Sequence, residues 1–90
     1  DAAFAAGLVD DVVADDQLRE RTRELAAAIA AHSPVALRLI KDAVRTATEA
    51  PLSAGLRHER ELFVTAFSSE DRAEGVAAFL EKRTPEFEGR

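Results

Sequence analysis

Phe79 and Lys82 are the residues of this 90-residue chain whose types and spacing come nearest to forming a binding site. They stand three positions apart in an Ala-rich segment that we expect to be helical, so they share one face near its end. An aromatic ring beside an ammonium group can hold a nucleotide, with the ring against the base and the cation near its polar edge or phosphates. The alternative is that Phe79 is a core residue and Lys82 only complements the helix dipole. By spacing alone, the alternative is the more common arrangement.

The remaining polar residues do not form a recognisable catalytic or metal site. Neither His32 nor His58 lies in an HExxH spacing, and the neighbours of His58 on a helix point in different directions. The four serines lack the context of a nucleophile elbow, and Gly75 is isolated rather than part of a phosphate-binding loop. We therefore predict solvated or structural histidines, no catalytic residue and no metal ligand within the chain.

Glu59 occupies an unusual position. On a helical wheel it falls within an apolar stripe made by Leu52, Leu56, Phe63 and Ala66. A buried carboxylate there needs a hydrogen-bonding or cationic partner. Two interpretations remain open. Either the stripe is only partly buried and Glu59 lies at a wet edge, or Glu59 is a buried anchor for a partner in another segment or subunit.

The composition restricts the classes of function. The net charge of -5 argues against nonspecific nucleic-acid binding, and no long uncharged run could span a membrane. There is no cysteine for a disulfide framework or a thiolate zinc site. We expect a cytoplasmic protein that binds neither nucleic acid nor membrane.

The length makes partner chains the expected source of additional buried area. Ninety residues form at most one small domain, and its apolar content is largely Ala, so each helix offers a thin stripe. The chain contains no Met and begins with Asp, and no targeting segment is visible. We expect a piece of a longer polypeptide.

The chain begins with the pattern of a helix end followed by a short strand. Residues 2–6 favour a helix closed by Gly7, which adopts the left-handed conformation without a Cβ penalty. Residues 7–13 are rich in β-branched side chains and predict one edge strand. A lone strand cannot satisfy its own backbone, so this one would require a partner from preceding sequence.

Four helices are predicted after the strand. Asp15 or Asp16 can cap the first, the Ser33–Pro34 pair predicts the start of the second, and Pro51 marks the third. Ser68 with Asp71 resembles a capping box that opens the fourth, which ends before Pro85. The fold class is therefore mainly α, with four helices and one short N-terminal strand.

The ordered set of these segments resembles the enoyl-CoA hydratase/isomerase (crotonase) family over the whole chain. The C-terminal pattern, Glu-Gly-x-x-Ala-Phe-x-x-Lys-Arg-x-Pro-x-Phe, carries most of this resemblance. Four earlier segments are also similar to the family: the Gly-Leu-Val strand at 7–13, the Ala-rich run at 26–30, Ser33–Pro34 with Lys41, and residues 51–56 with Glu59 and Phe63.

The resemblance implies the C-terminal part of a larger α/β spiral fold. Residues 1–14 would end the spiral core, and residues 15–90 would form a helical region for oligomerisation and coenzyme A contact. Phe79 and Lys82 match family residues that contact the adenine end of coenzyme A from a neighbouring subunit. The partners implied are acyl-CoA as substrate, the rest of the parent chain, and identical subunits in a trimer or a dimer of trimers. No covalently bound cofactor is implied.

The implied function is hydration of 2-enoyl-CoA thioesters in fatty-acid metabolism. The family's catalytic Glu residues and oxyanion hole lie upstream of this segment, so we expect these 90 residues alone to be inactive. The alternative is a free-standing acidic helical interaction module without enzymatic activity.

Overall fold

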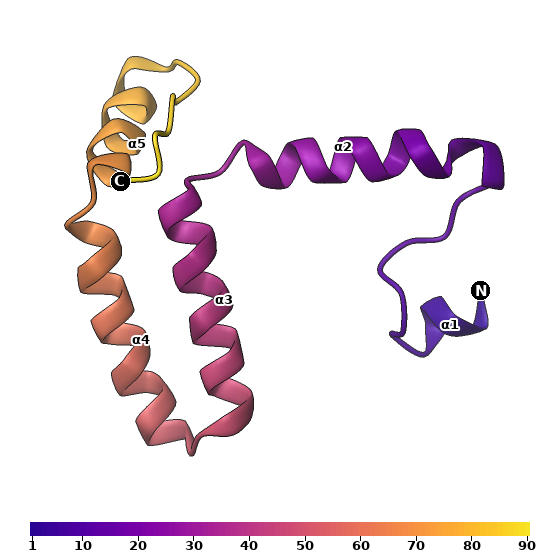
Figure 1. Ribbon diagram of the computed structural model, residues 1–90, viewed down its shortest axis with the longest axis horizontal. Coiled ribbons are helices and arrows are strands. Elements are labelled where there is room, and N and C mark those ends of the chain that lie inside the picture. The colour runs from indigo at the N-terminus through magenta and orange to yellow at the C-terminus, as the bar shows by residue number, and fades with distance from the viewer. The chain divides into compact units, whose positions relative to one another are not determined.

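The computed structural model describes residues 1–90, of which 71% are helical. The elements are α1 (Ala2–Ala5), a 3-10 helix η1 (Asp15–Gln17), α2 (Leu18–Ala30), α3 (Pro34–Glu49), α4 (Leu52–Phe67) and α5 (Glu70–Glu81) (Figure 1). They form two units, Asp1–Ala31 and His32–Arg90. The mainly α fold class and the four longer helices are confirmed. No helix combines the length and the hydropathy needed to cross a bilayer.

The first unit opens with α1, which ends as the sequence predicts. Gly7 follows it with a φ of 71°, in the left-handed region, and its N–H donates to the carbonyl of Phe4 at 3.0 Å. The domain boundary predicted between residues 14 and 15 falls inside this unit.

The strand predicted at residues 7–13 does not form, and the segment is irregular. A strand needs a neighbouring segment to pair with its N–H and C=O groups, and none of the 90 residues supplies one. Local side-chain hydrogen bonds and an ion pair hold the segment instead. The Val12 N–H donates to the Asp11 carboxylate at 2.9 Å, and Asp11 pairs with Arg21 of α2 at 2.7 Å.

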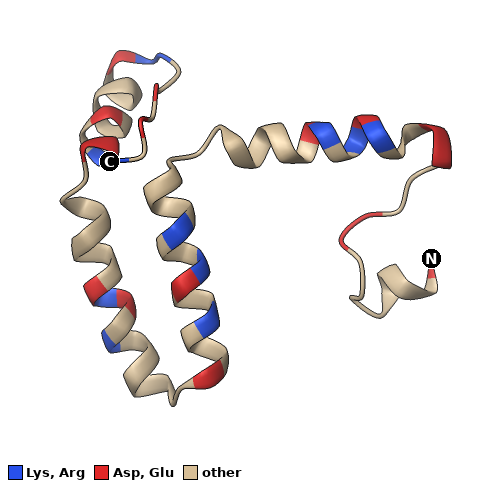
Figure 2. Cartoon of the chain, in the orientation of Figure 1, with Lys and Arg blue, Asp and Glu red and all other residues tan.

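Helix α2 begins differently from the prediction. Asp15 and Asp16 lie in the 3-10 turn that leads into α2, and Gln17 occupies the cap position without a side-chain hydrogen bond. The charged residues of α2 are confined to its N-terminal half (Figure 2). The apolar half that follows stays largely uncovered in this unit, because Leu25 and Ile29 remain exposed.

The second unit is built on a hairpin of α3 and α4, which run side by side in opposite directions (Figure 1). The predicted start of α3 is confirmed. Ser33 accepts a hydrogen bond from the Ala36 N–H at 3.2 Å, and Pro34 occupies the first turn, where its missing N–H is harmless. Helix α4 begins directly after Pro51.

Helix α5 has a different cap from the predicted one. Ser69, with an extended backbone, accepts from the Arg72 N–H at 3.1 Å. Ser68 keeps a right-handed helical conformation at the end of α4 and donates its hydroxyl to the Val64 carbonyl at 2.9 Å. The capping box of Ser68 with Asp71 is therefore wrong. Asp71 instead accepts hydrogen bonds from Ser33, Glu88 and Gly89.

The interior of the second unit is small. Ala78 is its only buried apolar residue, and the only buried polar ones are Ser33 and Asp71. Large apolar side chains on all three helices remain exposed, as expected from Ala-rich stripes. The most enclosed point therefore lies where α3, α5 and the C-terminal residues meet.

Candidate functional site

Phe79 and Lys82 lie at the C-terminal end of α5. We call these two residues the Phe79–Lys82 corner. The Phe79 side chain is exposed, with 80% of the residue surface accessible, so it is not a core residue of these 90 residues. Lys82 is also exposed and is the one non-glycine residue with a positive φ, at 56°. A ring and an ammonium group are thus available together at this end of the helix.

The backbone at Lys82 forms the helix ending in which glycine is most common. The Arg83 N–H reaches back to the Ala78 carbonyl at 3.0 Å, and Lys82 adopts the left-handed conformation. For a residue with a Cβ this conformation costs about 1–2 kcal/mol. A lysine at this position is therefore held there by its surroundings.

Phe79 forms part of the wall of an apolar groove of about 430 Å³. The groove is lined by residues of α3, α4, α5 and the C-terminal segment, including Val35, Phe63, Phe67, Val76, Leu80 and Phe87. The rings of Phe63 and Phe67 stack at 5.9 Å, and the Arg72 guanidinium lies 4.4 Å from the centre of the Phe67 ring. These contacts give the groove aromatic walls that suit a planar or apolar group.

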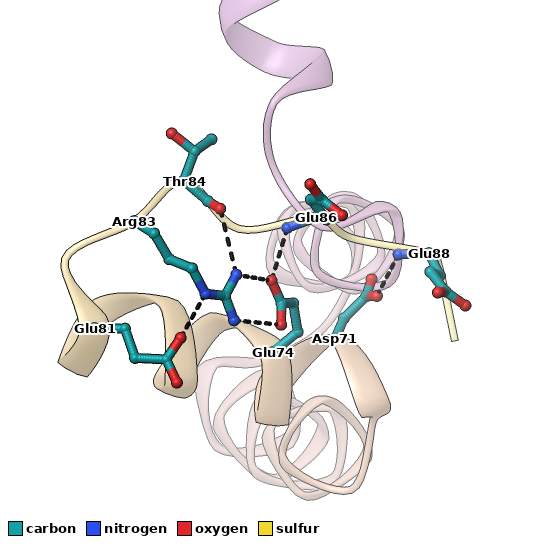
Figure 3. A network of polar contacts seen from close by, with 7 residues as sticks. All are labelled: Asp71, Glu74, Glu81, Arg83, Thr84, Glu86 and Glu88. Carbon is teal, nitrogen blue, oxygen red and sulfur yellow. Dashed lines mark hydrogen bonds and ion pairs between the residues drawn. The ribbon is translucent and has the colours of Figure 1, made fainter.

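The tail, residues 83–90, returns along α5 and is held by two carboxylates (Figure 3). Glu74 accepts from both terminal nitrogens of the Arg83 guanidinium, at 2.5 and 2.9 Å, and from the Glu86 N–H at 2.8 Å. The remaining guanidinium nitrogen, Nε, donates to Glu81 at 2.6 Å. A two-pronged pair of this kind fixes orientation as well as distance.

Asp71 is the second anchor and is only 3% exposed. It accepts from the Ser33 hydroxyl at 2.6 Å and from the N–H groups of Glu88 and Gly89 at 2.9 and 3.0 Å. Burial alone would raise the pKa of Asp71, but these hydrogen bonds outweigh it and hold the pKa below its ordinary value. Asp71 therefore connects the starts of α3 and α5 to the tail as a carboxylate.

Glu74 should make the tail contact depend on pH. The Arg83 hydrogen bonds, followed by the Glu86 N–H, lower the pKa of Glu74 from 4.5 to about 2. Because the folded pKa is the lower one, the stabilisation is complete above pH 4.5 and is lost as the pH falls through about 2. We expect the amide proton of Glu86 to show an NMR titration with a midpoint near 2. A midpoint near 4.5 would contradict the contact.

The structure brings no partner to Glu59. This residue is exposed and lines a second groove, of about 400 Å³, together with apolar residues that include Val44, Leu52 and Leu56. No hydrogen bond or ion pair reaches its carboxylate within the chain. Both interpretations of Glu59 thus depend on what covers this face.

The histidines do not form a metal site. His58 lies between Asp42 of α3, at 3.3 Å, and Glu61 of α4, at 3.9 Å, while His32 is exposed. No group of three or more His, Cys, Asp or Glu residues is arranged to hold a metal ion. The pairing of His58 with Asp42 depends on the register of the α3–α4 hairpin, for which the sequence has no signal.

Sequence reasoning missed the two tail anchors. Asp71 was assigned only to a helix cap, and Glu74 was given no role. One available signal was Pro85, two residues after Arg83, because a proline shortly after a helix end prevents the helix from continuing. The partner of Arg83 follows only from the path of the tail.

Comparison with known proteins gives consistent matches over the whole chain. Residues 1–90 match the enoyl-CoA hydratase/isomerase family. The chain is 51% identical over 88 residues to the 2,3-dehydroadipyl-CoA hydratase of Escherichia coli, covering 98% of this chain and 34% of that protein. It thus spans about a third of the length of the curated relatives that it matches.

Solved structures agree with this comparison. An enoyl-CoA hydratase from Bacillus anthracis superposes with a TM-score of 0.95 at 38% identity, over 99% of this chain and 34% of the other. An enoyl-CoA hydratase from Geobacillus kaustophilus superposes with a TM-score of 0.89 at 48% identity, over 99% of this chain and 35% of the other. The matched region is the C-terminal part of the relatives.

Proposed function

Because this chain belongs to the enoyl-CoA hydratase/isomerase family, we propose that it is the C-terminal segment of a cytoplasmic enzyme that hydrates 2-enoyl-CoA thioesters in fatty-acid metabolism. In this role it contributes part of the acyl-CoA pocket and contacts between subunits. The family match extends over all 90 residues, which favours this function over a free-standing interaction module.

The Phe79–Lys82 corner carries the proposal for acyl-CoA binding. The exposed ring of Phe79 offers a face to the adenine base, and the ammonium group of Lys82 offers a charge to its polar edge or to the phosphates. Both groups come from one end of α5, so a single ligand could meet them together.

In this proposal the reacting groups belong to the rest of the full-length enzyme, because this chain spans only about a third of the length of its relatives. A pair of backbone N–H groups there would polarise the thioester carbonyl, and two Glu residues would add water across the double bond. Asp71 and Glu74 are not assigned to that task, since their carboxylates are occupied by the tail.

The exposed apolar faces support the proposed assembly. Several large apolar side chains of α4 and α5 are more than half exposed, among them Leu52, Phe63, Val64, Phe67, Phe79 and Leu80. Surfaces of this kind mark contacts with other protein segments. We propose that they pack against the rest of the polypeptide and against neighbouring subunits of a trimer or a dimer of trimers.

Substitution of Phe79 tests the proposed contact. In the full-length enzyme, Phe79→Ala should raise the Kd for acyl-CoA about fivefold, because one base-stacking contact is lost. The Kd for the same acyl group on pantetheine, which lacks the adenosine moiety, should not change. Isothermal titration with both ligands makes the comparison.

Ile40→Ala is the control, because Ile40 is also a large exposed apolar residue but lies on α3, outside the groove that Phe79 lines. It should leave both affinities near those of the unmutated enzyme. If Phe79→Ala binds acyl-CoA normally, or weakens both ligands equally, the ring does not contact adenine.

A further inference from the structure

Lys82 occupies a backbone conformation that glycine would adopt more easily. It is the only residue with a side chain at positive φ, whereas the other residues with positive φ are Gly7 and Gly89. A strained non-glycine residue persists where its surroundings fix it, and such residues cluster at functional sites. Two features therefore need to be explained together: the presence of a lysine where glycine would fit more easily, and the contacts that hold its backbone.

The backbone of Lys82 is fixed from both sides. On the helix side, the N–H groups of Lys82 and Arg83 bond back to the carbonyls of Phe79 and Ala78. On the tail side, Arg83 is locked by the two oxygens of Glu74, one of which also accepts from the Glu86 N–H. Glu74 therefore joins the body of α5 to the chain on the far side of Lys82 (Figure 3).

Glu74 makes these contacts with its carboxylate turned to the tail. Its side chain is 26% exposed, less than that of Arg83 at 40%, and both of its oxygens are engaged by Arg83 and Glu86. The carboxylate of Glu74 is therefore committed to the chain that follows Lys82.

We propose that Glu74 is a positioning residue for Lys82. By binding Arg83 and the Glu86 N–H, it keeps Lys82 in the left-handed conformation. It thereby sets the direction in which the Lys82 side chain points. The inference rests on the proposed function, in which that ammonium group meets the base or the phosphates of acyl-CoA. Without Glu74, the corner samples other backbone conformations and apparent affinity falls with the fraction that is competent.

Glu70 provides a matched control on the same helix. It also pairs with an arginine of the tail, Arg90, at 2.9 Å, but it lies in the first turn of α5, far along the helix from Lys82. A purely structural role for tail ion pairs predicts similar effects at Glu70 and Glu74. A positioning role predicts an effect on ligand binding at Glu74 alone.

The test is a double-mutant cycle in the full-length enzyme, with Kd for acyl-CoA and for acyl-pantetheine measured by titration. Glu74→Gln should raise the Kd for acyl-CoA about threefold and leave acyl-pantetheine unchanged. Glu70→Gln should change neither. Lys82→Ala should raise the Kd for acyl-CoA about tenfold, and adding Glu74→Gln to it should cause no further loss.

Arg83→Lys is a milder variant in case Glu74→Gln folds poorly. It keeps the positive charge but gives up the two-pronged pair, and it should raise the Kd for acyl-CoA roughly twofold. Normal binding by Glu74→Gln alongside weakened binding by Lys82→Ala would overturn the positioning role and leave the proposed contact intact. Additive losses in the double mutant would also overturn it. Normal binding by Lys82→Ala would overturn both proposals.

Discussion

Replacing Asp71 with alanine should lower the Tm of the full-length protein by about 5–10 °C. The carboxylate is buried and accepts hydrogen bonds from Ser33, Glu88 and Gly89. Removing it leaves three donors without partners, in a place with little access to water. It also frees the tail from the starts of α3 and α5. Differential scanning calorimetry measures the shift.

Glu70→Ala is the appropriate control for this substitution. Both residues are acidic and lie in the first turn of α5, so the loss of charge beside the helix N-terminus is common to both. Glu70 is exposed and makes a surface ion pair with Arg90, which contributes little. Equal Tm shifts for the two variants would mean that the Asp71 hydrogen bonds do not anchor the tail.

The helices were predictable because local signals decide where they begin and end. Ser33 caps the start of α3 and Pro34 follows it, while Pro51 precedes α4. Gly7 closes α1 because glycine adopts a positive φ easily. The spacing of Phe79 and Lys82 likewise predicted that both lie at one end of one helix. Whether Phe79 is enclosed could not be predicted, because burial depends on the helices packed around it.

The missed features depend on contacts between segments distant in sequence. Residues 7–13 have strand composition, yet without a second segment to pair with they stay irregular. Asp71 stands three residues after Ser68, which suggests a cap, but its partners are Ser33 and the tail, 38 and 17 or more positions away. The left-handed conformation of Lys82 was also unpredicted, since the residue that most often adopts it at a helix end is glycine.

Lys82→Gly in the full-length enzyme should stabilise the protein and weaken its binding of acyl-CoA. Glycine adopts a positive φ without the Cβ penalty, and part of that gain is offset by the greater freedom of glycine in the unfolded chain. A net rise in Tm of about 1–3 °C is expected. Under the proposed function the Kd for acyl-CoA should rise about tenfold, because the proposed contact to a charged ligand would be worth about 1–2 kcal/mol.

Lys82→Ala separates the two effects. Alanine lacks the ammonium group but keeps the Cβ, so it should lose the same affinity as glycine without the gain in Tm. The chemical step should change less than binding in both variants, because the proposed contact would serve the ground state and the transition state alike.

The Kd of the Lys82→Gly variant for acyl-CoA, measured beside its Tm, tests most directly whether this segment supplies a ligand contact. We predict a Kd about ten times that of the unmutated enzyme together with a higher Tm. Unchanged affinity together with the higher Tm would mean that the lysine at the end of α5 contacts no ligand, and would contradict the proposed role of the Phe79–Lys82 corner.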